Sequence, residues 1–265
     1  MKPLRIIPPK NSEVPILVSV PHCGTAFPDE LIEQFKPERA TAPDDTDWFV
    51  DILYDFVTEM GITMIAAHYS RWIIDLNRDP KSKPLYTDGR IITELCPTTT
   101  FLGEPLYIDE RKLIVSEEVE RRVKLYYEPY HQRINELLTE LKEKYGRVLL
   151  WDCHSIRQIV PTIQKDKFPD LILGDADGSS GSPVLIRTVL NTLKKGGYSI
   201  NHNHPFKGGY ITRHFGKPEE NQYALQLEMT KVNYMNDDEK KYDKTRAEKM
   251  RSLLKNNFQA LIETL

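Results

Sequence analysis

Short apolar runs rich in β-branched residues alternate along this chain with segments of helical periodicity, and this alternation limits the fold more than any other feature. The runs at 15–20 and 147–151 are typical of core strands. The stretches 44–61, 116–145 and 182–195 repeat apolar residues at helical spacing, and a glycine closes or follows each of them. Strands that alternate with helices predict an α/β fold with a mostly parallel sheet.

The remaining segments extend this pattern. The stretch 62–78 predicts one or two strands, 223–230 predicts another strand, and a charged helix is expected to close the chain. Residues 79–115 are rich in proline and turn-forming residues and are expected to cross the surface irregularly. The glycine-containing segment 201–216 predicts a loop or hairpin. Because no repeat or clean linker is visible, residues 1–265 are expected to form a single domain.

Composition limits the classes of function. Hydrophobic residues make up 40% and charged residues 28%, which is the balance of a soluble globular protein. The net charge of −3 and the pI of about 6.2 argue against a dedicated nucleic-acid binder. No stretch approaches the ~20 apolar residues of a membrane span, and neither a signal peptide nor a C-x-x-C pair is visible. We expect a cytoplasmic protein without nucleic-acid or membrane partners, whose oligomeric state stays open.

Two of the apolar runs end in a histidine. His22 follows the run at 15–20, and His154 follows the run at 147–151. In open α/β sheets, ligands bind outside the carboxyl ends of the strands. Each histidine taken alone is more often a strand-end residue satisfied by backbone groups. Taken together they suit a catalytic zinc site, which often uses two histidines and one carboxylate and keeps a position open for water.

The third metal ligand is sought among Asp44, Asp45 and Asp47, which stand where the helix 44–61 is expected to begin. Acids at that position commonly cap a helix and interact favourably with its dipole. Three acids in four positions exceed what a cap requires. We choose Asp47 as the ligand and keep Asp45 as the alternative, because helical spacing does not separate them.

Four further side chains are candidates for chemistry. Arg71, Asn77 and Arg78 offer guanidinium and amide donors that suit a carboxylate, although alone they would be ordinary surface residues paired with acids. Glu228 stands inside an apolar strand pattern, where glutamate is uncommon unless it is paired or functional. It is therefore a candidate general base, and a structural salt bridge is the alternative.

The order of these motifs closely resembles the N-formylglutamate amidohydrolase (N-formylglutamate deformylase) family. The resemblance runs from about residue 15 to about 235 and rests on SVPHCGTAFP, DDTDW, YSRWIIDLNR, LLWDCHSIR, FKGGYITRHFG and ALQLEM. Each motif is weak alone, and six of them in this order are specific. The family is similar in turn to zinc carboxypeptidases and aspartoacylase. The resemblance thus implies a three-layer α/β/α sandwich around a mixed, mostly parallel sheet, like that of the zinc carboxypeptidases.

The resemblance also implies an activity, the metal-dependent hydrolysis of N-formyl-L-glutamate to L-glutamate and formate. Zn²⁺, or another divalent metal, would be held by His22, Asp47 and His154. Glu228 would be the catalytic base and Arg71 would polarise the scissile carbonyl. Histidine breakdown is the pathway expected for such a substrate.

Substrate binding follows from the same resemblance. Asn77 and Arg78 would grip the α-carboxylate of a small anionic amino-acid substrate, and we nominate Arg213 as the cation for its second carboxylate. The chain departs from the related patterns at two positions. Thr25 stands where carboxypeptidases have the acid ligand, and Cys23 stands where family members often have serine. A thiol there could bind metal or be oxidised, or simply be a small buried residue.

Two rival functions are kept. One is the same zinc chemistry on another acyl amino acid or on a peptide C-terminus. The other is a non-catalytic binder of small carboxylates, which would lack a metal ligand or the base. His22, His154 and Glu228 are all present, and this favours the enzyme.

Overall fold

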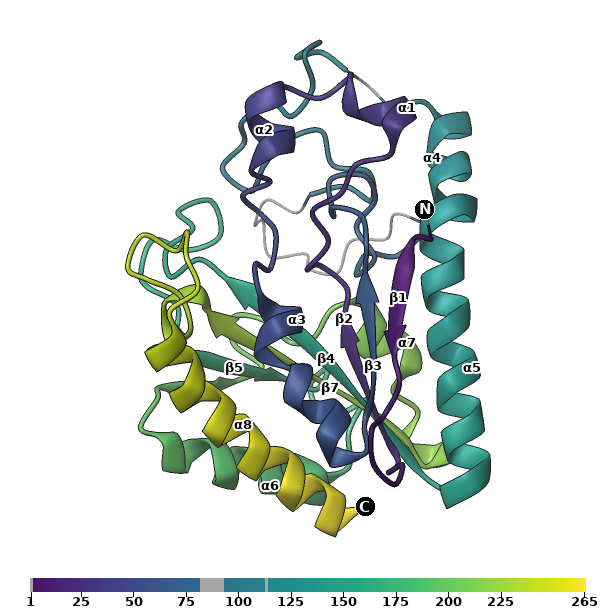
Figure 1. Ribbon diagram of the computed structural model, residues 1–265, viewed down its shortest axis with the longest axis vertical. Helices are drawn as coiled ribbons and strands as arrows, with labels where there is room; N and C mark the ends of the chain where they lie inside the picture. Colours follow the sequence, from purple (N-terminus) through teal and green to yellow (C-terminus); the bar gives the residue numbers. More distant parts are fainter. Residues whose placement is uncertain (1, 82–92, 113) are drawn as a thin grey trace.

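The computed structural model describes residues 2–81, 93–112 and 114–265, which fold around one seven-stranded sheet (Figure 1). The strands are β1 (Leu4–Ile7), β2 (Ile16–Val20), β3 (Thr63–Ala67), β4 (Val148–Ile156), β5 (Leu171–Gly174), β6 (Ile200–His202) and β7 (Gln222–Thr230). Their order across the sheet is β1-β3-β2-β4-β7-β5-β6. The central strands β3, β2, β4 and β7 are parallel, whereas β1 and the pair β5–β6 run the opposite way. The predicted mixed, mostly parallel sheet is confirmed.

Helices cover both faces of this sheet. The α-helices are α1 (Asp29–Ile32), α2 (Pro37–Thr41), α3 (Val50–Leu53), α4 (Ser116–Arg122), α5 (Glu128–Tyr145), α6 (Pro183–Leu193), α7 (Tyr210–Phe215) and α8 (Lys244–Thr264). Short 3-10 segments are η1 (Asp55–Met60), η3 (Lys194–Gly196), η4 (Pro218–Glu220) and η5 (Lys231–Asn233), and η2 (Val123–Tyr127) is a turn of π-helix. Helices α3, α6 and α8 pack on one face, and α5 and α7 pack on the other (Figure 1). The three-layer α/β/α arrangement is confirmed.

Each central strand divides its side chains between two cores, because successive residues of a strand point to opposite faces. In β4, Trp151 and Cys153 belong to the core under α3, α6 and α8, whereas Leu150 belongs to the core under α5. The same alternation directs Asp152 and His154 toward the α5 side. Both of these charged or ionisable side chains of the strand therefore lie on the same face.

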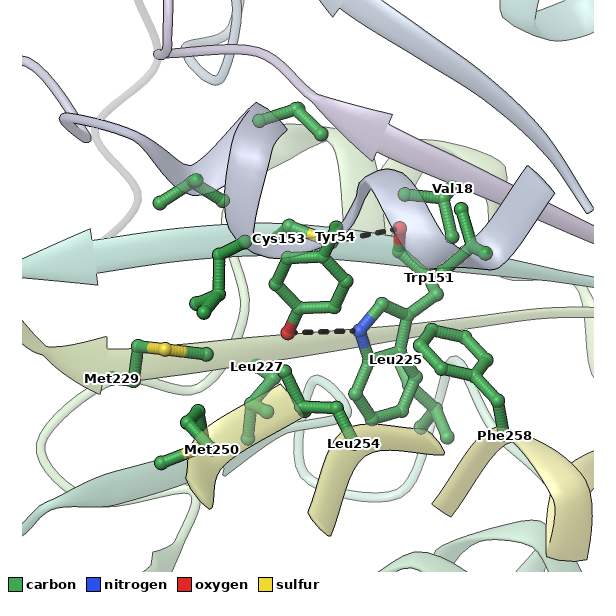
Figure 2. Close-up of a cluster of buried hydrophobic side chains, with 14 of the residues drawn as sticks. Val18, Tyr54, Trp151, Cys153, Leu225, Leu227, Met229, Met250, Leu254 and Phe258 are labelled. Atoms are coloured by element: carbon green, nitrogen blue, oxygen red, sulfur yellow. Dashed lines mark hydrogen bonds between the residues drawn. The ribbon is translucent and has the colours of Figure 1, made fainter. Parts of the chain in front are cut away.

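The core under α8 anchors the sheet (Figure 2). Trp151 is fully buried, and its ring centroid lies 5.5 Å from that of Phe258 on α8. Its indole N–H donates to the hydroxyl of Tyr54 at 3.5 Å, so the polar atom of this large ring is satisfied. Leu227 of β7 and Leu254 of α8 belong to the same buried cluster. Burial of each such side chain stabilises the fold by about 1.5–3 kcal/mol.

The long helical stretch predicted at 116–145 is confirmed over its whole length. Helix α4, the π turn η2 and helix α5 follow one another over 116–145, and Gly146 ends α5 with a left-handed φ of 76°. The predicted helix near 182–195 corresponds to α6 and η3, the charged closing helix to α8, and the strand at 223–230 to β7. None of the helices in the described part of the chain combines the length and apolar character that a bilayer span requires.

Two predicted elements have different bounds. The strand predicted at 147–151 continues to Ile156, because β7 pairs with β4 along its whole length. The helix predicted at 44–61 begins only at Val50, because Phe49 adopts a left-handed φ of 64°. Asp47 thus lies in the turn before α3 rather than on a helix.

The remaining segments were predicted with mixed success. Of the one or two strands predicted at 62–78, the structure has one, β3, and residues 71–78 form no second strand. The loop or hairpin expected at 201–216 contains the end of β6 and the helix α7. The proline-rich excursion 79–115 shows isolated bridges but no named helix or strand where it is described, and 82–92 and 113 lie outside the described residues.

Candidate metal centre and active site

The register of the central strands gathers polar side chains on the α5 side of the sheet. Asp152 of β4 pairs with Gln226 of β7, and His154 pairs with Glu228. Ser19 of β2 pairs with Asp152 from the other side and donates its hydroxyl to that carboxylate at 2.9 Å. These residues occupy alternate positions, so they share one face of three neighbouring strands. Sequence reasoning selected His154 and Glu228 but missed Asp152 and Gln226.

His22, Asp47 and His154 form a buried trio. One ligand atom from each residue lies within 4.8 Å of the others. Oδ2 of Asp47 is 3.2 Å from Nδ1 of His154 and 3.7 Å from Nδ1 of His22. The backbone N–H of Asp47 also donates to the carbonyl of His22 at 2.9 Å, which fixes the aspartate turn against the end of β2. The structure thus brings together the three residues selected as metal ligands.

Asp45, the alternative ligand, is used elsewhere. Its Oδ2 accepts hydrogen bonds from the indole N–H of Trp72 at 2.9 Å and from the backbone N–H of Phe101 at 3.0 Å. Burial raises the pKa of Asp45, against these hydrogen bonds. Of the two aspartates, Asp47 is therefore the one that faces the histidines.

The outward nitrogens of the two histidines are held by carboxylates. Nε2 of His22 lies 2.8 Å from Oδ1 of Asp75, and Nε2 of His154 lies 2.8 Å from Oδ2 of Asp152. Histidines that bind metals usually donate their second N–H to a carboxylate in this way. The inward Nδ1 of His22 is buried and has no hydrogen-bond partner among the described residues. This orphaned lone pair, beside a second imidazole and a carboxylate, fits a divalent cation.

The charged groups of the trio shift one another's pKa values. Burial alone would raise the pKa of Asp47, but hydrogen bonds from His154 and His22 hold it below its usual value. Burial would likewise lower the pKa of His154, and the charge of Asp152 raises it instead. The site therefore keeps negative charge on Asp47, which is the form that binds a cation.

Arg71 reaches the trio from the turn after β3. Its guanidinium donates to Oδ2 of Asp75 at 2.6 Å, and NH1 lies 4.0 Å from Oδ1 of Asp47. The ring of Phe101 lies over it, with its centroid 4.7 Å from the guanidinium carbon. Burial would lower the pKa of Arg71, but the charges of Asp75 and Asp47 raise it. A fixed cation thus stands beside the trio.

Asn77 lies beside His154, and both the nitrogen and the oxygen of its side-chain amide have partners within the protein. Its Nδ2 lies 3.0 Å from Nε2 of His154 and donates to Oε1 of Gln226 at 3.4 Å, and its Oδ1 accepts the backbone N–H of Ile211 at 2.8 Å. A Cβ atom on Gly209 would lie 2.2 Å from Nδ2 of Asn77, so only glycine allows this approach. The predicted grip of Asn77 on a substrate carboxylate stays a prediction.

The other predicted substrate-binding arginines lie further out. Arg78 donates to the carbonyl and hydroxyl of Thr93 at 3.1 and 3.2 Å, and its NH1 is 3.7 Å from Asp75. Arg213 is exposed on α7, and its Nε donates to the carbonyl of Gly208 at 2.9 Å. Their roles toward a substrate stay predictions.

Glu228 is buried next to His154 in the sheet register. Among the described residues, no lysine or arginine lies within ion-pair distance of its carboxyl group, so the alternative of a structural salt bridge finds no support. Burial raises the pKa of Glu228 to about 8, although the charge of His154 opposes this. A carboxyl group that titrates near neutral pH in such a site is suited to general acid–base catalysis.

Cys23 does not join the trio. Its thiol is buried and donates to the carbonyls of Val20 and Ala67 at 3.4 and 3.6 Å. Burial raises the pKa of this thiol, so it stays protonated. The structure gives Cys23 the place of a small buried residue.

A donor set of two imidazoles and one carboxylate, next to a glutamate that can carry a proton, is the arrangement that metal-dependent hydrolases use. The fold and the site thus define an α/β protein of the metallohydrolase class. Comparison with known proteins is more specific. The model of the N-formylglutamate amidohydrolase family matches residues 14–235. The chain belongs to this family, and the resemblance seen in its motifs is confirmed.

Individual relatives agree with this membership. The N-formylglutamate deformylase of Pseudomonas aeruginosa is 43% identical over 229 residues, which cover 86% of this chain and 85% of the relative. That of Pseudomonas putida is 39% identical over 254 residues, which cover 95% and 94%. The crystal structure of N-formylglutamate amidohydrolase from Ralstonia eutropha superposes with a TM-score of 0.83 at 28% identity, and the match covers 100% of this chain and 98% of that one.

Proposed function

We propose that this protein is a zinc-dependent amidohydrolase that hydrolyses N-formyl-L-glutamate to L-glutamate and formate. The observation that carries the proposal is the buried trio of His22, Asp47 and His154, in which Nδ1 of His22 has no hydrogen-bond partner among the described residues. Membership of the family supports the substrate. The proposed location is the cytoplasm and the proposed pathway is histidine breakdown.

The metal has a defined part in this proposal. Zn²⁺, or another divalent cation, held by His22, Asp47 and His154 would supply Lewis-acid chemistry, which activates water and polarises a carbonyl. The carboxylates of Asp75 and Asp152 would keep both imidazoles in the tautomer that leaves Nδ1 available. The chain therefore carries the ligands together with the groups that orient them.

Glu228 moves the proton. Its carboxylate takes a proton from the attacking water as the new carbon–oxygen bond forms at the formyl carbon. It then gives that proton to the amine nitrogen of glutamate as the carbon–nitrogen bond breaks. A pKa of about 8 allows the group to carry out both transfers near neutral pH.

Arg71 stabilises the charge that develops on the formyl oxygen. Its guanidinium is held by Asp75 and by the ring of Phe101, so little reorganisation is needed during the reaction. A preorganised donor of this kind typically contributes about 3 kcal/mol to the transition state. Arg78 and Asn77 are proposed to hold the α-carboxylate, and Arg213 is the cation nominated from the sequence for the second carboxylate.

The direct test is formate release by the purified protein from N-formyl-L-glutamate, N-acetyl-L-glutamate and N-formyl-L-methionine, with and without a chelator. We expect fast turnover of N-formyl-L-glutamate alone, loss of that turnover with the chelator, and recovery when Zn²⁺ is restored. Turnover that survives complete metal removal would contradict the metal-dependent mechanism. Zinc-loaded protein that leaves all three compounds intact would contradict the substrate.

A further inference from the structure

Asp47 reaches the metal trio from a strained turn. Of the three ligands, His154 lies in β4 and His22 follows β2, whereas Asp47 lies in the turn before α3. Phe49, two residues further on, adopts a left-handed φ of 64°. A residue with a Cβ atom is strained in this region, and such a conformation persists only where the surrounding contacts hold it. The position of the Asp47 carboxylate therefore depends on what holds this turn.

Tyr234, which follows β7 by a few residues, holds the turn close to its end. Its side chain is completely buried, and its hydroxyl donates to the backbone carbonyl of Trp48 at 2.9 Å. Trp48 stands between Asp47 and Phe49 in the sequence. The hydrogen bond therefore fixes the peptide group that joins Trp48 to the strained residue.

The same hydroxyl also contacts β4. It lies 2.8 Å from the hydroxyl of Ser155, which directly follows His154. Because successive residues of a strand point to opposite faces, Ser155 and His154 lie on different sides of the sheet. Tyr234 belongs to the core under α3, α6 and α8, so it contacts Ser155 on the face away from the metal trio. One phenol thus links the turn of Asp47 to the strand of His154.

Lys231 holds the beginning of the turn. This residue is 3% exposed, and its ammonium donates to the backbone carbonyl of Asp44 at 3.1 Å. Burial lowers the pKa of the ammonium, and the charges of Asp47, Asp44 and Asp45 oppose this effect. The segment after β7 thus provides a hydrogen bond to the turn at Asp44 and another at Trp48.

The segment that carries Lys231 and Tyr234 is itself fixed. The backbone N–H of Tyr234 donates to the carbonyl of Lys231 at 3.1 Å, at the end of the 3-10 turn η5. The carbonyl of Tyr234 accepts the backbone N–H of Asp243 at 3.0 Å, and Asp243 caps the start of α8. Both side chains therefore project from a segment that is tied to β7 and to α8.

We propose that Lys231 and Tyr234 are positioning residues, which hold the turn 44–49 and thereby set the place of Asp47 in the trio. The inference rests on the proposed function and deepens it, since Asp47 acts there as a ligand of the cation. A carboxylate that is already in place needs little ordering when a cation binds, and this increases the affinity. Loss of the two hydrogen bonds should therefore weaken cation binding although every ligand is still present.

Tyr234→Phe tests this directly, because it removes only the hydroxyl. The affinity for Zn²⁺ should fall about 10-fold, as for other residues that orient metal ligands. Competition against a chelator of known affinity measures the change.

Tyr145→Phe is the matched control. The hydroxyl of Tyr145 likewise donates to a backbone carbonyl, that of Glu13 at 2.6 Å. Glu13 precedes β2, whereas His22 follows it, so this bond lies at the opposite end of the strand. The control should bind Zn²⁺ like the wild type. Unchanged affinity in Tyr234→Phe would overturn the inference, and so would an equal decrease in both variants.

Hydrogen exchange of the metal-free proteins tests the turn without any cation. Two backbone N–H groups within the turn donate to backbone carbonyls, so their exchange reports on its opening. Peptides that cover 44–49 should exchange about 10-fold faster in Tyr234→Phe and in Lys231→Met than in the wild type, and Tyr145→Phe should match the wild type. Equal exchange in all four proteins would reject the inference.

The two measurements also separate this inference from the proposed function. A wild type that binds no Zn²⁺ would refute the metal-dependent function, and hydrogen exchange then decides alone whether Lys231 and Tyr234 hold the turn. A wild type that binds Zn²⁺ but hydrolyses none of the three compounds would refute the substrate only, and both measurements remain decisive for the turn.

Discussion

The two nitrogens of each imidazole in the trio have different roles. The outward Nε2 atoms of His22 and His154 contact the carboxylates of Asp75 and Asp152, both of which are completely buried. A carboxylate in that position fixes the ring orientation and increases the basicity of the inward nitrogen. The affinity of the centre for a cation therefore depends on residues that would never touch the cation.

Asp152→Asn tests this dependence. The amide keeps the shape but removes the charge that favours an N–H on Nε2 of His154, so the affinity for Zn²⁺ should fall about 10- to 100-fold. Competition against a chelator of known affinity measures the change. Asp166→Asn, in the segment after β4 and exposed, is the control and should bind Zn²⁺ like the wild type. Equal affinities in all three proteins would contradict the role of Asp152.

Replacing Glu228 should lower the activity of the protein and, at high pH, raise its stability. Glu228→Gln removes the proton acceptor, so kcat should fall about 10²- to 10⁴-fold while the bound zinc is retained. The pKa of about 8 in the folded protein lies above that of an exposed glutamate, so the folded state binds more protons between the two values. The wild type thus loses stability as pH rises toward 8, and the glutamine variant does not.

The stability of this variant is measured by urea unfolding of the metal-free proteins at pH 5 and pH 8.5. The free energy of unfolding of Glu228→Gln should exceed that of the wild type more at the higher pH. An identical pH dependence in the two proteins would show that Glu228 is not held with a raised pKa.

Among the elements, the long helix 116–145 supports the active site from behind. Tyr127, the last residue of the π turn η2, donates its hydroxyl to the carbonyl of Arg78 at 2.8 Å, and Nε2 of His131 in α5 donates to the carbonyl of Leu76 at 2.8 Å. The two rings are stacked with centroids 4.0 Å apart. Both carbonyls that flank Asn77 are thus fixed by one helical face. Single π turns often occur where a helix contributes to a functional site.

His131 also makes the stability of the protein depend on pH. Burial lowers its pKa to about 4, whereas a histidine in the unfolded chain titrates near 6.5. The unfolded state binds the extra proton between these values, so stability is lost as pH falls from about 6.5 to about 4, by up to about 3 kcal/mol.

His131→Gln keeps a donor for the carbonyl of Leu76 but cannot titrate. Its free energy of unfolding should therefore fall less than that of the wild type between pH 7.5 and pH 4.5, as measured in urea for both metal-free proteins. The same decrease in both proteins would assign the pH dependence to other groups.

At the scale of the whole molecule, the centre depends on strand ends that are distant in sequence, and this decides what the sequence could predict. His22 and His154 were found because an apolar run that ends in a histidine is a local signal. Asp47 was chosen from a cluster of acids whose separate roles depend on contacts with β2, Trp72 and Phe101. The alternation of strands and helices along the chain was enough to predict the three-layer arrangement.

Other features depend on contacts that no local pattern contains. Asp152 was missed because β4 continues past its apolar run, and only pairing with β7 extends it that far. Lys231 directly follows β7, where a lysine is normally exposed, but here it is buried. Helix α7 follows a glycine pair that reads as a loop, and it forms where Asn77 and Gln226 bind the backbone N–H groups at its start.

The positions of the tryptophans should make the intrinsic fluorescence of the protein sensitive to cation binding. The chain has three tryptophans, and each lies within three residues of a residue of the centre in the sequence. Trp48 follows Asp47, Trp72 donates its indole N–H to Asp45, and Trp151 lies in the same strand as His154. Indole emission responds to nearby charge and to the polarity of its surroundings. Loading of a cation, and its removal, should therefore be visible as a change in intrinsic fluorescence, without any attached dye.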